Sequence, residues 1–230
     1  MYSNSTFRKQ VEHAWLNGKK VLLTAGPTYE PIDPVRFIGN HSTGKMGYAL
    51  AQAFADLGAQ VYLISGPTQL SILHANITVF KVTTADQMFA QAKEVAEETD
   101  IWVFAAAVAD YKPKEVATVK VKKNEETLTL ELIKNVDIAK ALGQVKRTHQ
   151  VSVGFALETN NELENARAKL QSKNLDLIVL NSLQDAGAGF KHDTNKITII
   201  DKDRVTEFEL KPKTEVAQDI IKVIAQKIHA

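Results

Sequence analysis

Short apolar runs alternate with helical patterns along most of the chain. Val21–Ala25 is an apolar run closed by Gly26, and its length and flanks predict a buried strand. In Tyr48–Leu57, small apolar residues recur at four-residue steps up to Gly58, which predicts a helix and its end. Thr84–Gln87 has the form of a capping box that opens another helix. The alternation predicts further strands at Gln60–Ser65, Val79–Val82, Asp100–Ala107, Val151–Ala156 and Leu175–Asn181, and helices at Thr84–Glu98, Val136–Leu142 and Asn161–Lys173. Such repetition indicates a mostly parallel, doubly wound α/β sheet.

The pattern changes over residues 111–134, where no helix is indicated. Leucines alternate with polar residues over Thr127–Leu132, which predicts a half-buried antiparallel strand. Lys120–Lys123 is its expected partner, with a turn near Asn124. The chain then ends in a second hairpin and a helix, expected at Lys196–Asp201, Val205–Leu210 and Thr214–Ile228. Because a protruding hairpin usually packs against another surface, we expect the segment 111–134, called the arm below, to contact a partner subunit.

The composition is that of an ordinary globular chain. Of 230 residues, 44% are hydrophobic and 24% charged, and 28 Lys and Arg balance 27 Asp and Glu, for a net charge of +1. This balance argues against nucleic-acid binding through a basic field. Cysteine is absent, which excludes disulfides, thiolate catalysis and cysteine-ligated metals, and no apolar run reaches the roughly 18 residues of a membrane span. The polar start lacks a signal peptide, so we expect one cytoplasmic domain over residues 1–230.

A long, proline-containing segment joins the first strand to the first helix, where doubly wound sheets bind ligands. It nearly fits a P-loop, but Met46 stands where Ser or Thr would hold Mg²⁺. It also fails as a dinucleotide site, because the second strand ends in Ser65 and Gly66 without an acidic residue. Gly44 and Gly47 could let main-chain N–H groups approach an anion at the helix N-terminus, or serve packing alone.

Two other groups of residues are candidates for ligand binding. Ala105–Ala107, with Asp110 shortly after them, lie at the C-terminal end of the fourth predicted strand, where small side chains suit a flat ligand or close packing. Lys169 and Lys173 are neighbours on one helix face, so they either bind a polyanion or belong to a solvated surface. The six histidines have no metal-ligand spacing, and no Ser–His–Asp arrangement is visible.

Five motifs in order carry a family resemblance: G-P-T-x-E-P-I-D-P-V-R-x-I-x-N-H-S-[ST]-G-K-M-G, A-A-A-V-A-D-Y, V-K-V-K-K, K-N-x-D-I and G-F-A-x-E-T. From about Val21 to Leu180 the chain resembles bacterial phosphopantothenoylcysteine synthetase, which implies a Rossmann-like fold and a ligase of coenzyme A biosynthesis. The carboxylate of 4′-phosphopantothenate would attack the α-phosphorus of CTP and release pyrophosphate. The amine of cysteine would then attack the acyl-cytidylate and release CMP. Mg²⁺ is expected on the nucleotide phosphates.

The resemblance also implies roles for individual residues. Asn40 would contact the acyl-nucleotide intermediate, and Lys120 would neutralise triphosphate charge. Arg36 and Lys45, with Asn40, would bind phosphopantothenate. The implied nucleotide site, besides Lys120, comprises Ala105, Ala106, Ala107, Asp110, Asn135, Val136, Asp137, Ile138, Phe155, Lys169 and Lys173.

The chain departs from the family pattern at a few places. Val136 replaces an expected proline, Gly39 an expected Ser or Thr, and Thr43 a common Ser. About twenty residues before the first strand cannot hold the flavin-dependent decarboxylase domain of many bacterial versions, so we expect a stand-alone synthetase linked to a separate decarboxylase. The arm corresponds to the family's dimerisation region and predicts a homodimer. The rival hypotheses are a dehydrogenase-like reductase and a non-catalytic nucleotide-binding module.

Overall fold

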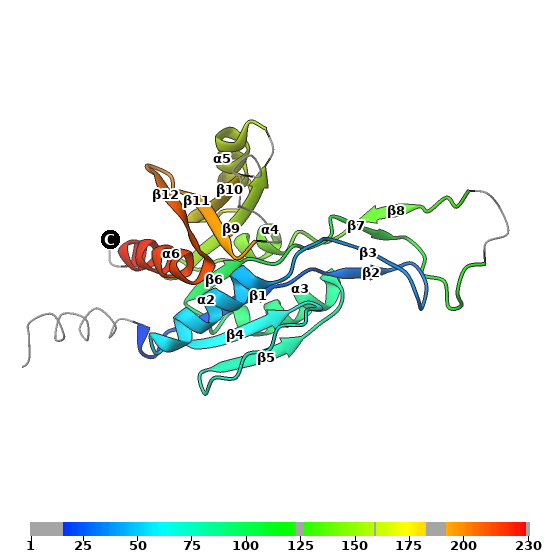
Figure 1. Cartoon of the computed structure of the whole chain (residues 1–230), viewed down its shortest axis with the longest axis horizontal. Helices are drawn as coiled ribbons and strands as arrows, with labels where there is room; N and C mark the ends of the chain where they lie inside the picture. Colours follow the sequence, from blue (N-terminus) through cyan, green and yellow to red (C-terminus); the bar gives the residue numbers. More distant parts are fainter. Residues whose placement is uncertain (1–15, 123–126, 159, 183–191, 229–230) are drawn as a thin grey trace, which may run out of the picture.

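An eight-stranded sheet forms the centre of the molecule (Figure 1), in the order β12-β11-β10-β9-β6-β1-β4-β5. The computed structural model describes residues 16–122, 127–158, 160–182 and 192–228. The sheet strands are β1 (Lys20–Ala25), β4 (Gln60–Ser65), β5 (Ile77–Lys81), β6 (Ile101–Phe104), β9 (Val151–Glu158), β10 (Leu177–Ser182), β11 (Thr194–Ile200) and β12 (Val205–Pro212). The strands from β10 to β5 are parallel, while β11 and β12 join antiparallel at one edge. The expected mostly parallel sheet is confirmed.

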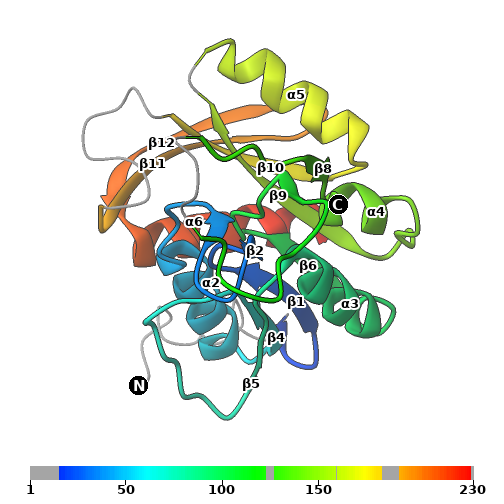
Figure 2. The same cartoon turned by 90° about the vertical axis from the view of Figure 1, so that its right-hand side faces the viewer.

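Helices cover both faces of the sheet (Figures 1 and 2). One face carries α2 (Lys45–Asp56) and α6 (Lys213–Ile228), and the other carries α3 (Ala85–Ala96), α4 (Ile138–Gly143) and α5 (Glu162–Ser172). From β1 the chain adds β4 and β5 on one side, then crosses to β6 and continues to β9 and β10 on the other. The reversal beside β1 is the point where doubly wound sheets bind ligands.

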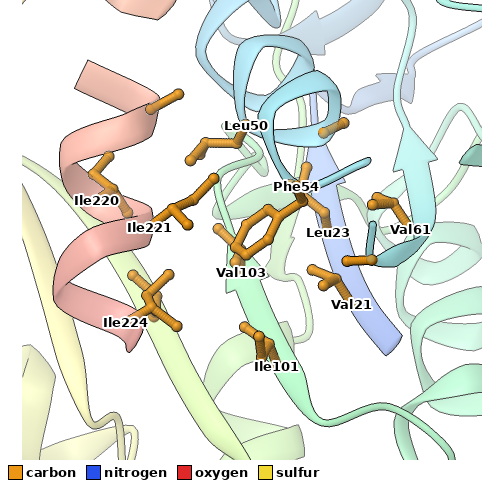
Figure 3. Packing of buried hydrophobic residues seen from close by; sticks show 14 of the residues in the cluster. Val21, Leu23, Leu50, Phe54, Val61, Ile101, Val103, Ile220, Ile221 and Ile224 are labelled. Carbon is orange, nitrogen blue, oxygen red and sulfur yellow. The ribbon is translucent and has the colours of Figure 1, made fainter. Parts of the chain in front are cut away.

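The strands are apolar on both faces because both faces are buried. Along β1, Val21 and Leu23 pack with α2 and α6, whereas Leu22 belongs to the cluster under α3, α4 and α5. Figure 3 shows Phe54 of α2 beside Leu23, with Ile220 and other α6 residues across the same cluster. Helix α2 is therefore held against both the sheet and α6, and this packing fixes the position of its first turn.

Local capping places two helix starts. The predicted capping box of α3 is confirmed, since the Thr84 hydroxyl accepts from the Gln87 N–H and the Gln87 side chain accepts from the Thr84 N–H. Helix α4 begins after the predicted Val136, because the carboxylate of Asp137 accepts from the Lys140 N–H and caps it there. The remaining predicted helices and central-sheet strands are present with ends shifted by a few residues.

Two boundaries depend on backbone conformations that a periodic pattern does not reveal. Helix α2 begins before the predicted Tyr48, because Gly44, with φ of 80°, turns the chain into the helix from the left-handed region. Strand β6 ends at Phe104, so the predicted strand over Ala105–Ala107 is wrong. The N–H groups of Ala105 and Ala107 still donate to the carbonyls of Thr24 and Gly26, which keeps this segment beside the chain that leaves β1.

The segment between β1 and α2 contains a small hairpin that the sequence pattern did not indicate. Strands β2 (Tyr29–Pro31) and β3 (Phe37–Gly39) pair antiparallel. The rings of Tyr29 and Phe37 stack with centroids 3.8 Å apart. Each strand has three residues, which is too short for alternation to be recognised.

The arm is built differently from the prediction. Strand β7 (Tyr111–Pro113) pairs antiparallel with β8 (Leu132–Lys134), so the pairing of Lys120–Lys123 with Thr127–Leu132 is wrong for the described residues. The predicted turn at Asn124 lies outside the described residues. Leu128, Leu130 and Leu132 are exposed rather than half-buried, because the arm leaves the sheet and runs beside β2 and β3 (Figure 1).

Asp33 ties the arm to the β2–β3 hairpin. Its buried carboxylate accepts from the Arg36 Nε at 3.0 Å and from the Val121 N–H at 3.2 Å. The Arg36 Nη2 also donates to the Val121 carbonyl at 2.9 Å. The Arg36 guanidinium holds the pKa of Asp33 well below its ordinary value.

We predict that Asp33→Asn loosens this attachment and lowers stability. Since the pKa of Asp33 is lowered in the folded state, its stabilisation is complete above the unfolded pKa of about 4 and is lost as the pH falls. At neutral pH the variant should unfold several degrees below the wild type, and the difference should shrink on acidification. Thermal unfolding followed from neutral pH to below about pH 4 measures the difference in melting temperature between the variant and the wild type. Asp203→Asn, at an exposed position, is the control. A pH-independent difference would contradict the assignment.

Candidate functional site

A cavity of about 710 Å³ lies at the carboxyl ends of the parallel strands. Its walls come from the end of β1, the segment after β6, the end of β9, the end of β10 and the start of α2. The volume is within the range of small-molecule sites. Its position beside β1 is where the chain order of the sheet reverses.

Small residues after β6 form one wall. The Ala107 N–H donates to the Gly26 carbonyl at 2.9 Å, and the Ala106 N–H donates to the Thr24 hydroxyl at 3.3 Å. The segment is thereby pinned against the chain leaving β1. Because alanine side chains are short, a ligand can approach the main chain closely along this wall.

The segment before α4 is attached to the same wall. The Asn135 N–H donates to the Asp110 carbonyl and its Nδ2 donates to the Ala109 carbonyl, both at 2.8 Å. These bonds bring the A-A-A-V-A-D and K-N-x-D-I motifs together in the cavity. Asp110 is exposed, and it lines the cavity.

The lysines of α5 have acidic partners within the site. Lys169 Nζ lies 2.5 Å from Glu158 Oε1, and Lys173 Nζ lies 2.9 Å from Asp137 Oδ2. Both lysines line the cavity. An ammonium group has three N–H donors, so each lysine retains donors for a ligand while its carboxylate fixes its position.

Asn40 lines the cavity beside the alanine wall, and hydrogen bonds hold its side-chain amide in place. Its Nδ2 donates to the carbonyls of Ala107 and Val108, at 3.1 and 3.2 Å. The residue is exposed and lines the cavity. The two carbonyls orient the carboxamide, so its oxygen and plane are presented in a fixed direction.

The start of α2 forms a further wall. Gly44 is the N-cap residue, the helix has no side-chain cap, and its first turn contains no acidic residue. Its N-terminal N–H groups therefore suit an anion. Gly47 has a packing role, since a Cβ there would lie 2.5 Å from the Cβ of Ala25. The packing alternative is therefore confirmed for Gly47, and anion binding at Gly44 stays a prediction.

All the predicted site residues except Arg36 and Lys120 line this cavity. Those two line a second pocket of about 450 Å³ with Val35, Val121 and Lys122, between the β2–β3 turn and residues 120–122 of the arm. Sequence reasoning missed several lining residues. Asn181, at the end of a parallel strand, was recognisable by position. Asn195 lies near the start of the antiparallel strand β11 and Lys213 directly follows β12, so neither gave a signal.

Metal binding by protein groups alone is not indicated in the part of the chain that the structure describes. No three His, Cys, Asp or Glu side chains gather there closely enough to hold an ion. A Mg²⁺ ion would need phosphate oxygens as its main ligands, with a carboxylate such as Asp110 near them. Within the same ranges we also find no helix with the length and hydropathy of a membrane-crossing segment.

Comparison with known proteins gives a family and close relatives. The DNA/pantothenate metabolism flavoprotein C-terminal domain matches residues 16–228. The crystal structure of the C-terminal domain of the coenzyme A biosynthesis bifunctional protein CoaBC is 42% identical with a TM-score of 0.79, covering 93% of this chain and 97% of that chain.

Longer curated proteins also match. The CoaBC protein of Bacillus subtilis (strain 168) is 48% identical over 91% of this chain and 52% of its own length. A protein of an unknown prokaryotic organism, named cysteine/cysteine sulfinic acid decarboxylase, is 49% identical over 96% of this chain and 62% of its own length. The chain thus spans half to two thirds of these relatives.

Proposed function

Since the chain belongs to the family of the DNA/pantothenate metabolism flavoprotein C-terminal domain, we propose that it joins 4′-phosphopantothenate to cysteine in coenzyme A biosynthesis, with CTP as the activating nucleotide. The observation that carries this proposal is the cavity at the reversal beside β1. It gathers residues from the loop before α2, the segment after β6, the segment before α4, β9 and α5. Four of the five family motifs contribute residues to this cavity, and the fifth, V-K-V-K-K, lies in the arm.

Activation is required because a carboxylate is a poor electrophile. In the first step a carboxylate oxygen of phosphopantothenate bonds to the α-phosphorus of CTP, and the bond to pyrophosphate breaks. Lys45, Lys169, Lys173 and the first turn of α2 supply positive charge for the phosphates. Mg²⁺ bound to the phosphates would neutralise further charge.

In the second step the amine of cysteine attacks the acyl carbon. The acyl–phosphate bond breaks, CMP leaves, an amide forms and the amine loses its proton. Asn40, anchored on the Ala107 and Val108 carbonyls, is a neutral polar group that can contact the anhydride without being acylated. The protein's contribution is mainly to position the reactants and complement their charge.

The arm suggests how the protein assembles. Phe37, Val119 and Leu128 are 50%, 73% and 53% exposed, and they belong to the arm and the hairpin beside it. A group of exposed apolar side chains on a protruding element is typical of an interface. We propose that a second copy of the chain covers it, as a homodimer.

Pyrophosphate release tests the proposed reaction. We expect pyrophosphate on adding CTP and phosphopantothenate together, and CMP turnover only when cysteine is also present. CTP binding without pyrophosphate release would instead favour a non-catalytic nucleotide-binding module. A thermal shift with nicotinamide cofactors would favour the reductase. Repeating the assay with ATP measures the nucleotide preference.

A further inference from the structure

A buried lysine lines the cavity near the start of α2, on the side formed by β10, β11 and α6. Lys213, the first residue of α6, is 8% exposed and contributes to the cavity lining. Its ammonium group donates to the main-chain carbonyl of His192. A buried lysine is uncommon because burial costs its charged form solvation. Because Lys213 lines a ligand-sized cavity, an anion bound there would offset the cost of burying its charge.

A second lysine lies next to it. Lys45, in the first turn of α2, lines the same cavity and pairs with Asp193 at 2.5 Å. Burial, and then the charge of Lys45, lower the pKa of Lys213, while the charge of Asp193 acts in the opposite direction. The Asp193 carboxylate thus acts on both lysines, and its side chain is 84% exposed.

The surroundings favour an anion with several oxygens. The first turn of α2 has no side-chain cap and no acidic residue, so its N–H groups add to the positive field of the lysines. The neighbouring wall is neutral and polar, with Asn195 donating to Asn181 at 2.9 Å. Asp193 occupies the position of counter-ion to Lys45, and because it is exposed it can move away when a ligand anion arrives.

We propose that Lys213 and Lys45 form a phosphate-binding subsite, and that Asp193 is the counter-ion which a substrate phosphate displaces. The inference rests on the proposed function for the identity of the substrates. It goes beyond it by assigning a role to Lys213 and Asp193, which lie outside the family motifs quoted above. Two substrate phosphates have the required chemistry: the terminal phosphates of the nucleotide and the phosphate of phosphopantothenate.

Direct binding of inorganic pyrophosphate tests the subsite without turnover. Lys213→Met keeps the length of the side chain and removes its charge, so we expect at least about tenfold weaker binding by calorimetry. Asp193→Asn removes the competing carboxylate, so binding should become several-fold tighter. Lys222→Met, on the same helix but with its side chain 72% exposed, should match the wild type.

Two pairs of ligands identify the source of the phosphate. If the nucleotide occupies the subsite, Lys213→Met weakens CTP far more than CMP; if the other substrate does, it weakens phosphopantothenate far more than pantothenate. Unchanged pyrophosphate affinity in a folded Lys213→Met variant overturns the subsite. If that variant does not fold, unchanged affinity in Asp193→Asn does so. A wild-type protein that binds pyrophosphate but never releases it from CTP refutes the proposed function and leaves the subsite standing.

Discussion

Replacing Asn40 by aspartate should slow the cysteine-dependent release of CMP by at least about a hundredfold, on the scale of a lost transition-state contact. In the wild type the Asn40 amide nitrogen donates to the carbonyls of Ala107 and Val108, at 3.1 and 3.2 Å. A carboxylate has no hydrogen to donate, so it would repel both carbonyl oxygens. It would also place a negative charge beside the acyl-nucleotide intermediate, which forms only after CTP has reacted.

CTP affinity separates this effect from a general loss of the site. Because the phosphates are held by other groups, CTP should bind the Asn40→Asp variant within about twofold of the wild type. His41→Ala, at the exposed neighbouring position, is the matched control and should keep its rate. A wild-type rate of CMP release from Asn40→Asp would remove the assigned role while leaving the fold and cavity intact.

The sheet could be predicted because its strands obey a simple burial rule. Val21 and Leu22 face opposite clusters, so a run that is apolar at every position is what two covered faces require. The start of α3 could be predicted as well. The side chains of Thr84 and Gln87 each accept a hydrogen bond from the main-chain N–H of the other residue, within one turn. Both features depend on residues close together in sequence.

The arm could not be predicted because strand pairing depends on distant residues. Alternating leucines indicate an extended segment, yet nothing in their period shows that Leu132 pairs with Pro113 rather than with residues near Lys120. The exposure of Leu128 was missed for a related reason. Alternation shows which side chains share a face of a strand, but it does not show whether that face is covered. The hairpin over Tyr29–Gly39 was missed because each of its strands has three residues.

The position of the cavity could be predicted from the strand ends, but the full set of residues that line it could not. Parallel strands end at one edge, which brought Ala105–Ala107, Asp110 and Phe155 together as expected. Lys213 reaches the same cavity from an antiparallel hairpin and the helix after it, so its position depends on how that hairpin folds back on the sheet. Arg36 and Lys120 were expected at the cavity, and the structure places them in a second pocket where the β2–β3 turn meets the arm instead.

That placement gives Lys120 a test of its own. Since Lys120 lines a pocket between the arm and the β2–β3 turn and not the cavity of its own chain, we expect it to act on the cavity of a second copy. Lys120→Gln should then reduce CTP-dependent pyrophosphate release by at least about a hundredfold, as loss of a phosphate-neutralising cation does. Lys114→Gln, elsewhere on the arm and paired with Glu131, should retain the wild-type rate.

Co-expression of two inactive variants decides whether the copies share a site. A heterodimer of Lys120→Gln and Asn40→Asp carries both substitutions in one site and neither in the other, provided that Lys120 reaches across. Random pairing should therefore restore about a quarter of the wild-type sites, which differently tagged chains and an assay of cysteine-dependent CMP release, the readout that both variants lose, would measure. If each cavity used its own Lys120, every site would carry one lesion and no activity would return. A restored rate thus requires a site built from two chains, because neither chain alone supplies both intact residues.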